Sequence, residues 1–380
     1  MVQDTIDSSK FKTFTRLILV FILIYLFLVS ISLMGVAFKG FGKDFAENLI
    51  QTTSNPFVGL FIGILATSIV QSSSTTTAIL VGMVGSGVIT VANAVPIVMG
   101  ANIGTAVTGM LVSLAHIGRR EEFKRAIVGS AIHVFFNIMC VFIMFTLEMM
   151  LGILSKTANW MSDIFVNVGG IKFTSPIKAA TAPLTHLIED MALRLPIPEN
   201  IAYIVILGIS IAILFFALYY IVNLMKSLVV KRAEIVLNNV IGKYGAMAII
   251  VSALFTAIIQ SSSITTALMI PLVASGILTI ETLFPIILGA NIGTTATAIL
   301  ASFATGNIAA VTVAFVHFLF NMAGVFLIYP IKALRRIPVN LAKALGEISF
   351  KKRRYAIFFV LTLFYILPGV LIVASKLLEK

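Results

Sequence analysis

The chain has 380 residues, of which 59% are hydrophobic and only 11% are charged, and its mean hydropathy is +1.08. Soluble domains carry about 25% charged residues, so this composition excludes an ordinary soluble protein and predicts a membrane protein. The net charge of +12 does not indicate nucleic-acid binding, because the Lys and Arg residues fall in short stretches between apolar runs.

Apolar runs recur along the whole chain. A run of ~20 residues is long enough to cross a hydrocarbon core of ~30 Å as a helix. We therefore expect membrane crossings at residues 17–38, 94–115, 126–154, 201–225, 283–303, 308–329 and 355–375. The mixed segment 39–55 is expected to lie at the membrane interface.

Two further apolar stretches, residues 56–90 and 246–277, each contain the polar sequence Gln-Ser-Ser-Ser near their middle. The arms on either side of the first break have about 14 residues, which span ~21 Å as helix, too little for a full crossing. We therefore predict two re-entrant helical hairpins, each with its tip at the polar break.

The polar break belongs to a longer internal repeat. The sequence QSSSTTTA at residues 71–78 recurs as QSSSITTA at 260–267, and GANIGT occurs at both 100–105 and 289–294. Each half then has a His followed four residues later by Asn. Because the first half crosses three times, the second begins on the opposite side of the membrane. The predicted fold class is an all-α polytopic membrane protein with two inverted-topology repeats, each with a re-entrant hairpin and a broken helix.

The distribution of charge predicts the orientation. Most of the 27 basic residues lie on one side of this topology, and the positive-inside rule places that side in the cytoplasm. We expect a multi-pass protein of the cell (inner) membrane with a cytoplasmic N-terminus and an extracytoplasmic C-terminus. The expected regions are an N-terminal repeat at 1–154, an extracytoplasmic loop at 155–200, a C-terminal inverted repeat at 201–330, and a basic cytoplasmic segment with a final membrane helix at 331–380.

The polar breaks suit an anion that is carried together with small cations. Free N–H groups at the start of each second arm, near 73–75 and 262–264, favour an anion through their hydrogen bonds and the helix dipole. Ser and Thr hydroxyls donate to anionic oxygens. The amide oxygens of Gln71 and Gln260, with main-chain carbonyls freed at the break, are suitable ligands for a hard cation such as sodium.

The two GANIGT motifs are expected to complete the site. Asn102 and Asn291 offer further amide oxygens, and the glycine two residues later permits an unwound backbone near Thr105 and Thr294. No Lys or Arg lies in either hairpin or in the crossing that comes after it. Co-bound cations must then neutralise an anion, which gives a physical reason for coupled transport.

With these motifs the chain resembles the type II sodium–phosphate cotransporter family over residues 56–154 and 201–329. The resemblance implies a sodium-coupled symporter of inorganic phosphate that works by alternating access, with no catalytic residue, no cofactor and sodium as its only metal. The phosphate ligands that it implies are Ser72, Ser73, Ser74, Thr75, Ser261, Ser262 and Ser263. The sodium ligands that it implies are Gln71, Asn102, Thr105, Gln260, Thr265, Asn291 and Thr294.

Three features depart from the animal members of that family. Electrogenic members have an Asp directly after the first-repeat His, where this chain has Val134. We therefore expect electroneutral transport, with one fewer sodium site. Segment 155–200 lacks the cysteines of the family's disulfide, and the short C-terminal region is typical of a compact bacterial member.

Several alternatives stay open. The residue chemistry alone indicates only an oxyanion, so sulfate, arsenate or a small carboxylate could replace phosphate as cargo. An ion channel is less favoured, because paired breaks that open to opposite faces indicate alternating access. An enzyme is not expected, since the crossings hold no convincing nucleophile–base pair, paired Asp or HExxH motif.

Expected partners are phosphate, sodium and the lipid bilayer, with no nucleic acid. His133 and His317 are expected to be structural and to face the Asn four residues later.

Overall fold

The computed structural model describes residues 2–168, 176–240 and 245–378, and every regular element in these ranges is a helix. Seven of the described helical segments are long and apolar enough to cross a membrane. They are Thr15–Gly40 of α1 (Val2–Gly40), α5 (Val91–Leu114), α6 (Arg120–Leu151), Glu199–Met225 of α9 (Glu199–Val240), α12 (Ile280–Thr305), α13 (Ile308–Ile328), and Arg354–Leu377, which comprises α15 (Arg354–Leu361), the π-helical η1 (Thr362–Ile366) and most of α16 (Leu367–Leu378). Each overlaps one predicted crossing, so the prediction of an all-α polytopic membrane protein is confirmed.

Four shorter apolar helices form two hairpins at the predicted polar breaks. The first hairpin consists of α3 (Pro56–Val70) and α4 (Ser73–Ser86), and the second of α10 (Gly245–Ile259) and α11 (Ser262–Ala274). The arms have 15, 14, 15 and 13 residues. At ~1.5 Å per residue, no single arm is long enough to cross a hydrocarbon core of ~30 Å.

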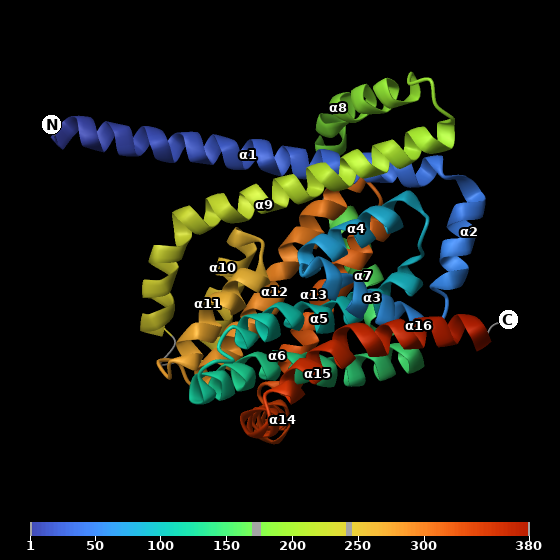
Figure 1. Ribbon diagram of the computed structural model, residues 1–380. Coiled ribbons are helices and arrows are strands. Elements are labelled where there is room, and N and C mark those ends of the chain that lie inside the picture. The colour runs from blue at the N-terminus through green and yellow to red at the C-terminus, as the bar shows by residue number, and fades with distance from the viewer. Residues whose placement is uncertain (1, 169–175, 241–244, 379–380) are drawn as a thin grey trace.

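The hairpins pack among the long helices (Figure 1). α3 packs along α5 and α10 along α12, while α4 contacts α12 and α11 contacts α5 and α6. α1 and α9 run side by side along one side of the bundle. Each hairpin therefore contacts long helices from the other half of the chain, and both polar breaks face one another within the bundle.

Glycines on α5 and α12 allow the hairpins to approach closely. A Cβ on Gly100 would lie 1.9 Å from the main-chain oxygen of Leu60 in α3. A Cβ on Gly289 would lie 2.2 Å from the main-chain oxygen of Ile249 in α10. Any side chain at either position would force the two helices apart, because both neighbouring atoms belong to the backbone.

The GANIGT motifs do not interrupt their helices. α5 is helical from Val91 to Leu114 and α12 from Ile280 to Thr305. The expected unwinding near Thr105 and Thr294, and with it the broken helix of each half, is therefore wrong. The glycines of these motifs serve close helix packing, a role that leaves the helical hydrogen bonds intact.

The segment 155–200, expected as a loop, is largely helical where it is described. α7 (Ile153–Val168) begins where the buried carboxylate of Glu148 accepts the N–H of Leu154 at 2.7 Å. α7 packs against α13, and Thr312 donates its hydroxyl to Ser162 at 2.9 Å. α8 (Pro176–Leu193) packs against α1 and α9. Residues 169–175 of this segment lie outside the described residues.

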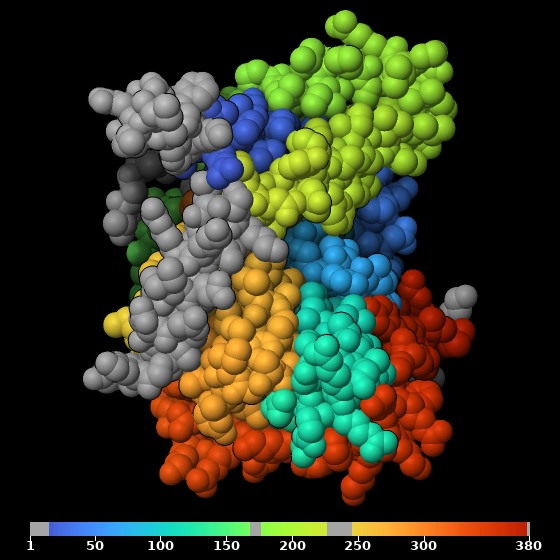
Figure 2. Space-filling view, turned by 60° about the vertical axis from the view of Figure 1, so that its left-hand side comes forward, coloured from blue at the N-terminus to red at the C-terminus, as the bar shows by residue number. Residues whose placement is uncertain are grey.

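Two amphipathic helices complete the described fold. α2 (Gly42–Thr52) precedes the first hairpin and is bent by 99° from α3. α14 (Lys332–Lys351) packs against α6. In Figure 2, α14 forms part of the lower edge of the molecule, below the α10–α11 hairpin and the first turns of α6.

Candidate functional site

The first hairpin turns through a left-handed backbone conformation at Gln71, where φ is 56°. Gln71 and Gln260 are the only non-glycine residues with positive φ among the described residues, and this conformation is unfavourable for a residue with a Cβ. Ser72 then begins α4 as its N-cap, and its Oγ accepts the N–H of Thr75 at 3.2 Å. One helix thus ends and the next begins within two residues.

The second hairpin has the same backbone geometry. Gln260 ends α10 with a φ of 59°, and the Oγ of Ser261 caps α11 by accepting the N–H of Ile264 at 3.4 Å. The repeat in sequence therefore corresponds to a repeat in conformation. Unfavourable backbone conformations that persist in a folded protein concentrate at functional sites, which singles out both tips.

The two tips touch each other through a reciprocal pair of hydrogen bonds. Ser74 in the first hairpin donates its hydroxyl to the main-chain oxygen of Gln260 at 3.2 Å. Ser263 in the second donates to the main-chain oxygen of Gln71, also at 3.2 Å. The N-terminal ends of α4 and α11 are thereby brought together. Two helix N-termini at one place concentrate N–H donors and positive dipole ends, which favours an anion.

Some polar groups at the tips have no hydrogen-bond partner among the described residues. The side chains of Ser73 and Ser262 are each 3% exposed, and neither hydroxyl makes a hydrogen bond with the described residues. The Oε1 atom of Gln260 is buried and likewise unpaired in this part of the chain. Buried polar groups are nearly always hydrogen-bonded, so these three positions are suited to meet a ligand or water.

Asn291 lies in a buried hydrogen-bond network that joins the two halves. Its Oδ1 accepts from His133 Nε2 at 2.9 Å, and its Nδ2 donates to Asn137 Oδ1 at 2.9 Å. Asn137 Nδ2 donates in turn to the main-chain oxygen of Asn102. The expectation that His133 faces Asn137 on its own helix is therefore incomplete, because both side chains bind Asn291 of α12.

The corresponding network in the second half is not formed. His317 is 1% exposed, and neither of its ring nitrogens has a partner among the described residues. Asn321 donates instead to the main-chain oxygen of His317 at 3.0 Å, and Asn102 donates to that of Val98 at 2.9 Å. The two halves thus share a sequence motif but differ in the bonds that it makes.

The predicted threonine ligands are engaged within the protein. Their bonds are Thr75 Oγ1 with Ser72 Oγ (2.8 Å), Thr265 Oγ1 with Thr256 Oγ1 (2.8 Å), Thr105 Oγ1 to Ala101 O (2.9 Å) and Thr294 Oγ1 to Ala290 O (2.8 Å). A donating hydroxyl keeps acceptor lone pairs for a cation. Within the described chain, no hydrogen bond joins the GANIGT residues Asn102, Thr105, Asn291 and Thr294 to either tip. The asparagine network is therefore not linked to the tips by hydrogen bonds in the described part of the chain.

Two contacts at the first hairpin come from residues that the sequence did not single out. Thr108 of α5 donates its hydroxyl to the main-chain oxygen of Gln71 at 3.4 Å. Tyr365 donates to the main-chain oxygen of Ser68 at 3.1 Å from the π-helical turn η1. A π-helical turn inside an α-helix is often found at functional sites. Nothing in the local sequence predicts this turn.

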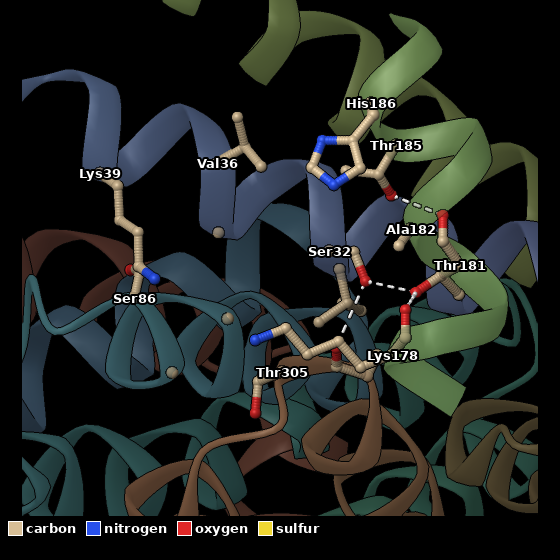
Figure 3. Close-up of a pocket in the computed structure, with 15 residues that line it drawn as sticks. Ser32, Val36, Lys39, Ser86, Lys178, Thr181, Ala182, Thr185, His186 and Thr305 are labelled. Carbon is tan, nitrogen blue, oxygen red and sulfur yellow. Dashed lines mark hydrogen bonds between the residues drawn. The ribbon is translucent and has the colours of Figure 1, made fainter. Parts of the chain in front are cut away.

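A separate cavity of about 130 Å³ lies between α1, α4, α8 and α12. Figure 3 shows Lys178 and His186 beside it, and on its wall the hydroxyls of Ser32 and Thr181 lie 3.0 Å apart. The Lys178 side chain reaches the C-terminal end of α12, where a Cβ on Gly306 would lie 2.8 Å from its Cδ. A cation there complements the negative end of the helix dipole, so its position needs no ligand in the cavity.

Comparison with known families gives a match over both hairpins. A family model described as Na⁺/Pi-cotransporter matches residues 26–174 and 213–341. These ranges contain both QSSS breaks and both GANIGT motifs.

Curated relatives include the sodium-dependent phosphate transport protein 2B of Pongo abelii and of Homo sapiens, each 32% identical over 448 residues. The sodium-dependent phosphate transport protein 2A of Ovis aries is 32% identical over 419 residues. The alignments cover 94%, 94% and 91% of this chain and 65% of each relative. The chain therefore spans just under two thirds of the length of these relatives. No solved structure matches the chain.

Proposed function

Because this chain belongs to the Na⁺/Pi-cotransporter family, we propose that it transports inorganic phosphate together with sodium across a membrane. The names of the relatives, sodium-dependent phosphate transport proteins 2A and 2B, support both ions. The observation that carries the proposal is the meeting of two polar helix breaks inside an apolar bundle, where Ser74 binds Gln260 and Ser263 binds Gln71.

Phosphate is proposed to bind between the two tips. The N-termini of α4 and α11 supply main-chain N–H groups and positive dipole ends. The unpaired hydroxyls of Ser73 and Ser262 supply two donors of their own. The remaining residues of the proposed phosphate set are Ser72, Ser74, Thr75, Ser261 and Ser263. Their hydroxyls either exchange a hydrogen bond within the protein for one to the anion, or keep that bond and orient the two helix ends.

Sodium is proposed to bind beside phosphate and to neutralise it. Residues 56–118 and 245–331 contain no Lys or Arg, so the hairpins and the crossings that come after them supply no cation of their own to balance the negative charge. Gln260 Oε1, buried without a partner, is the leading sodium ligand. The remaining members of the proposed set are Gln71, Asn102, Thr105, Thr265, Asn291 and Thr294. Asn291 Oδ1 accepts one hydrogen bond from His133 and keeps a second lone pair for sodium.

Transport is proposed to proceed by alternating access between two inverted repeats. In this mechanism the two halves exchange conformations around a fixed site. The two histidines support that proposal. His133 is hydrogen-bonded to Asn291, whereas the ring nitrogens of His317, its counterpart in the second half, have no partner among the described residues. The two halves therefore have different conformations at matching positions, as alternating access requires. The charge distribution supports a cytoplasmic N-terminus and an extracytoplasmic C-terminus in the cell membrane.

The cycle is proposed to be electroneutral. Val134, next to His133, is fully buried in α6 and brings no carboxylate to the network. The four hairpin helices hold no acidic residue. Two sodium ions with one divalent phosphate would then cross without net charge.

Uptake of radiolabelled phosphate into proteoliposomes tests the proposal. An inward sodium gradient should drive saturable uptake that an equal potassium gradient does not support. Equal uptake in both salts would overturn sodium coupling. A membrane potential set with potassium and valinomycin should leave the uptake rate unchanged, and a potential-dependent rate would overturn electroneutrality.

The cargo is tested by competition in the same vesicles. Excess sulfate or a small carboxylate should reduce labelled uptake less than unlabelled phosphate does. Arsenate, which has the shape and charge of phosphate, should compete about as well as phosphate. Stronger inhibition by sulfate or a carboxylate would identify that anion as the better cargo.

A further inference from the structure

Several completely buried polar atoms in the described chain have no hydrogen-bond partner, and the proposed phosphate and sodium sites use only one of them. The residues that carry these atoms are Thr67, Gln260, Thr297, His317 and Ser349. Gln260 belongs to the proposed sodium site. Buried polar groups are nearly always hydrogen-bonded, so the other residues need a separate explanation.

Thr297 of α12 corresponds to Thr108 of α5 at the repeat shift that carries Gln71 to Gln260. Thr108 donates its hydroxyl to the main-chain oxygen of Gln71 at 3.4 Å. The Thr297 hydroxyl is buried and makes no such bond within the described residues. The repeat assigns it the main-chain oxygen of Gln260, which accepts the Ser74 hydroxyl in this conformation.

The first hairpin has the opposite asymmetry. Thr67 of α3 corresponds to Thr256 of α10 at the same shift. Thr256 Oγ1 shares a hydrogen bond of 2.8 Å with Thr265 of α11, which joins the two arms of the second hairpin. Thr67 Oγ1 is buried without a partner in the described chain, and Thr76, the counterpart of Thr265, donates to the main-chain oxygen of Ser72 at 3.1 Å. Here the bonded copy lies in the second half.

His317 is the third residue of this kind. Its counterpart in the first half, His133 of α6, binds Asn291 of α12 at 2.9 Å. The same contact in the other half would join His317 of α13 to Asn102 of α5, and α13 packs against α5. In all three pairs, one copy is bonded and the other is buried without a partner in the part of the chain that the structure describes.

From this pattern we propose that Thr67, Thr297 and His317 are positioning residues that hold the opposite-facing conformation of the transport cycle. The inference rests on the alternating access proposed above, in which two inverted repeats exchange their local structures. The bonds that then form from these residues lead, in the same order, to Thr76 Oγ1, the Gln260 main-chain oxygen and Asn102 Oδ1. The bonds of Thr256, Thr108 and His133 break in the same step.

The exchange keeps the two conformations close in free energy. Each conformation has one bonded and one unpaired copy of every pair, so a bond lost in one half is offset by a bond gained in the other. A carrier needs this balance, because a conformation that is strongly favoured over its alternative is the only one populated.

Nitrogen-15 spectra of the full-length protein, labelled at histidine, test the exchange without any transport. The chain has four histidines, and the variants His133→Leu and His317→Leu identify the two buried ones. Thr297→Val should raise the hydrogen-bonded fraction of His133 Nε2 and lower that of His317, because it removes a bond only from the opposite conformation. Thr108→Val should have the reverse effect. Bonded fractions that change independently of each other would overturn the proposal.

Phosphate uptake into proteoliposomes gives the functional readout. Thr297→Val should lower kcat by ~5-fold, the effect of one lost hydrogen bond, and leave the melting temperature unchanged. Addition of Thr108→Val should restore most of the kcat, because the two substitutions remove one bond from each conformation. A double variant slower than Thr297→Val, or a lower melting temperature in Thr297→Val, would reduce the residue to a structural role and overturn the proposal.

Ser349→Ala is the matched control, because this hydroxyl is also buried without a partner in the described chain but lies in α14, outside the repeated motifs. It should change neither kcat nor the histidine spectra. His317→Gln keeps a side-chain N–H donor and should retain a higher kcat than His317→Leu, and equal rates would contradict the assigned bond. If the parent protein shows no sodium-driven uptake, the proposed function fails, and the histidine spectra still decide the exchange.

Discussion

Ser74 donates its hydroxyl to the main-chain oxygen of Gln260 across 3.2 Å, although 186 residues separate the two in sequence. The matching bond from Ser263 to Gln71 makes the contact reciprocal. The turn carbonyl of each hairpin thus accepts a hydrogen bond from the other half of the chain. The polar groups without a partner among the described residues at this junction, those of Ser73, Ser262 and Gln260, are the ones available to cargo.

Ser73→Ala and Ser262→Ala should each raise the KM for phosphate without lowering stability. Neither hydroxyl bonds to the described protein, so its removal takes a donor only from the anion. A hydrogen bond to a charged group contributes ~1.5–3 kcal/mol, or about 10- to 100-fold in affinity. Proteoliposome uptake gives the KM, and melting in detergent gives the stability. Ser210→Ala, which removes a buried hydroxyl bonded to Leu207 in α9, is the control and should leave the KM unchanged.

Gln260→Ala should raise the sodium concentration that gives half-maximal uptake. The buried Oε1 of Gln260 has no partner in the described part of the chain, so its loss removes a proposed sodium ligand. Gln71→Ala is the matched control, because both residues have left-handed backbones (φ 56° and 59°) and both substitutions carry the same backbone penalty. The Gln71 side chain is exposed, and its loss should have a smaller effect. Equal shifts in both variants would contradict the assignment of Gln260 as the leading sodium ligand.

His133→Leu should destabilise the protein, whereas His317→Leu should not. The first change leaves Asn291 Oδ1 without its donor in a buried network, at a penalty of ~1–3 kcal/mol. The second replaces a buried ring whose nitrogens are unpaired in the described chain, so an apolar side chain is neutral or stabilising. Melting temperatures in detergent compare the two variants directly. Equal destabilisation would contradict the asymmetry between the halves.

Gly100→Ala should destabilise the protein by several kcal/mol or prevent its accumulation. The added Cβ would lie 1.9 Å from the main-chain oxygen of Leu60, and a backbone atom can yield only if α3 and α5 separate. Gly35→Ala in α1 meets nothing within 4 Å and is the control. Expression level and melting temperature measure the difference. A normal melting temperature for Gly100→Ala would show that the contact between α3 and α5 is loose.

The positions of the crossings and of both hairpins could be predicted because hydrophobicity and chain length determine them directly. The polar breaks at residues 71–74 and 260–263 were visible for the same reason, since four polar residues interrupt an otherwise apolar run. The role of the GANIGT glycines could not be predicted. A glycine that permits a break and a glycine that permits close packing look alike in sequence, and only the neighbouring backbone of Leu60 distinguishes them.

The partners of the candidate site were harder to predict than its residues. His133 and Asn137 were expected to face each other because they are four residues apart on one helix. They bind Asn291 instead, a contact that depends on how α6 packs against α12. The Tyr365 contact depends on the π-helical turn in the last crossing, whose sequence is ordinary for a membrane helix. Long-range packing decides such contacts, and local spacing does not encode them.

The reciprocal bonds between the hairpin tips mean that neither half of the protein is self-sufficient. A half produced by itself would lose the serine bond to its turn carbonyl, at Gln71 or Gln260, and Gln71 would keep only the longer bond from Thr108. Such a fragment could restore the reciprocal contact only by associating with a second chain. A gene split between the two halves should therefore yield a working protein only when both products are made in the same cell.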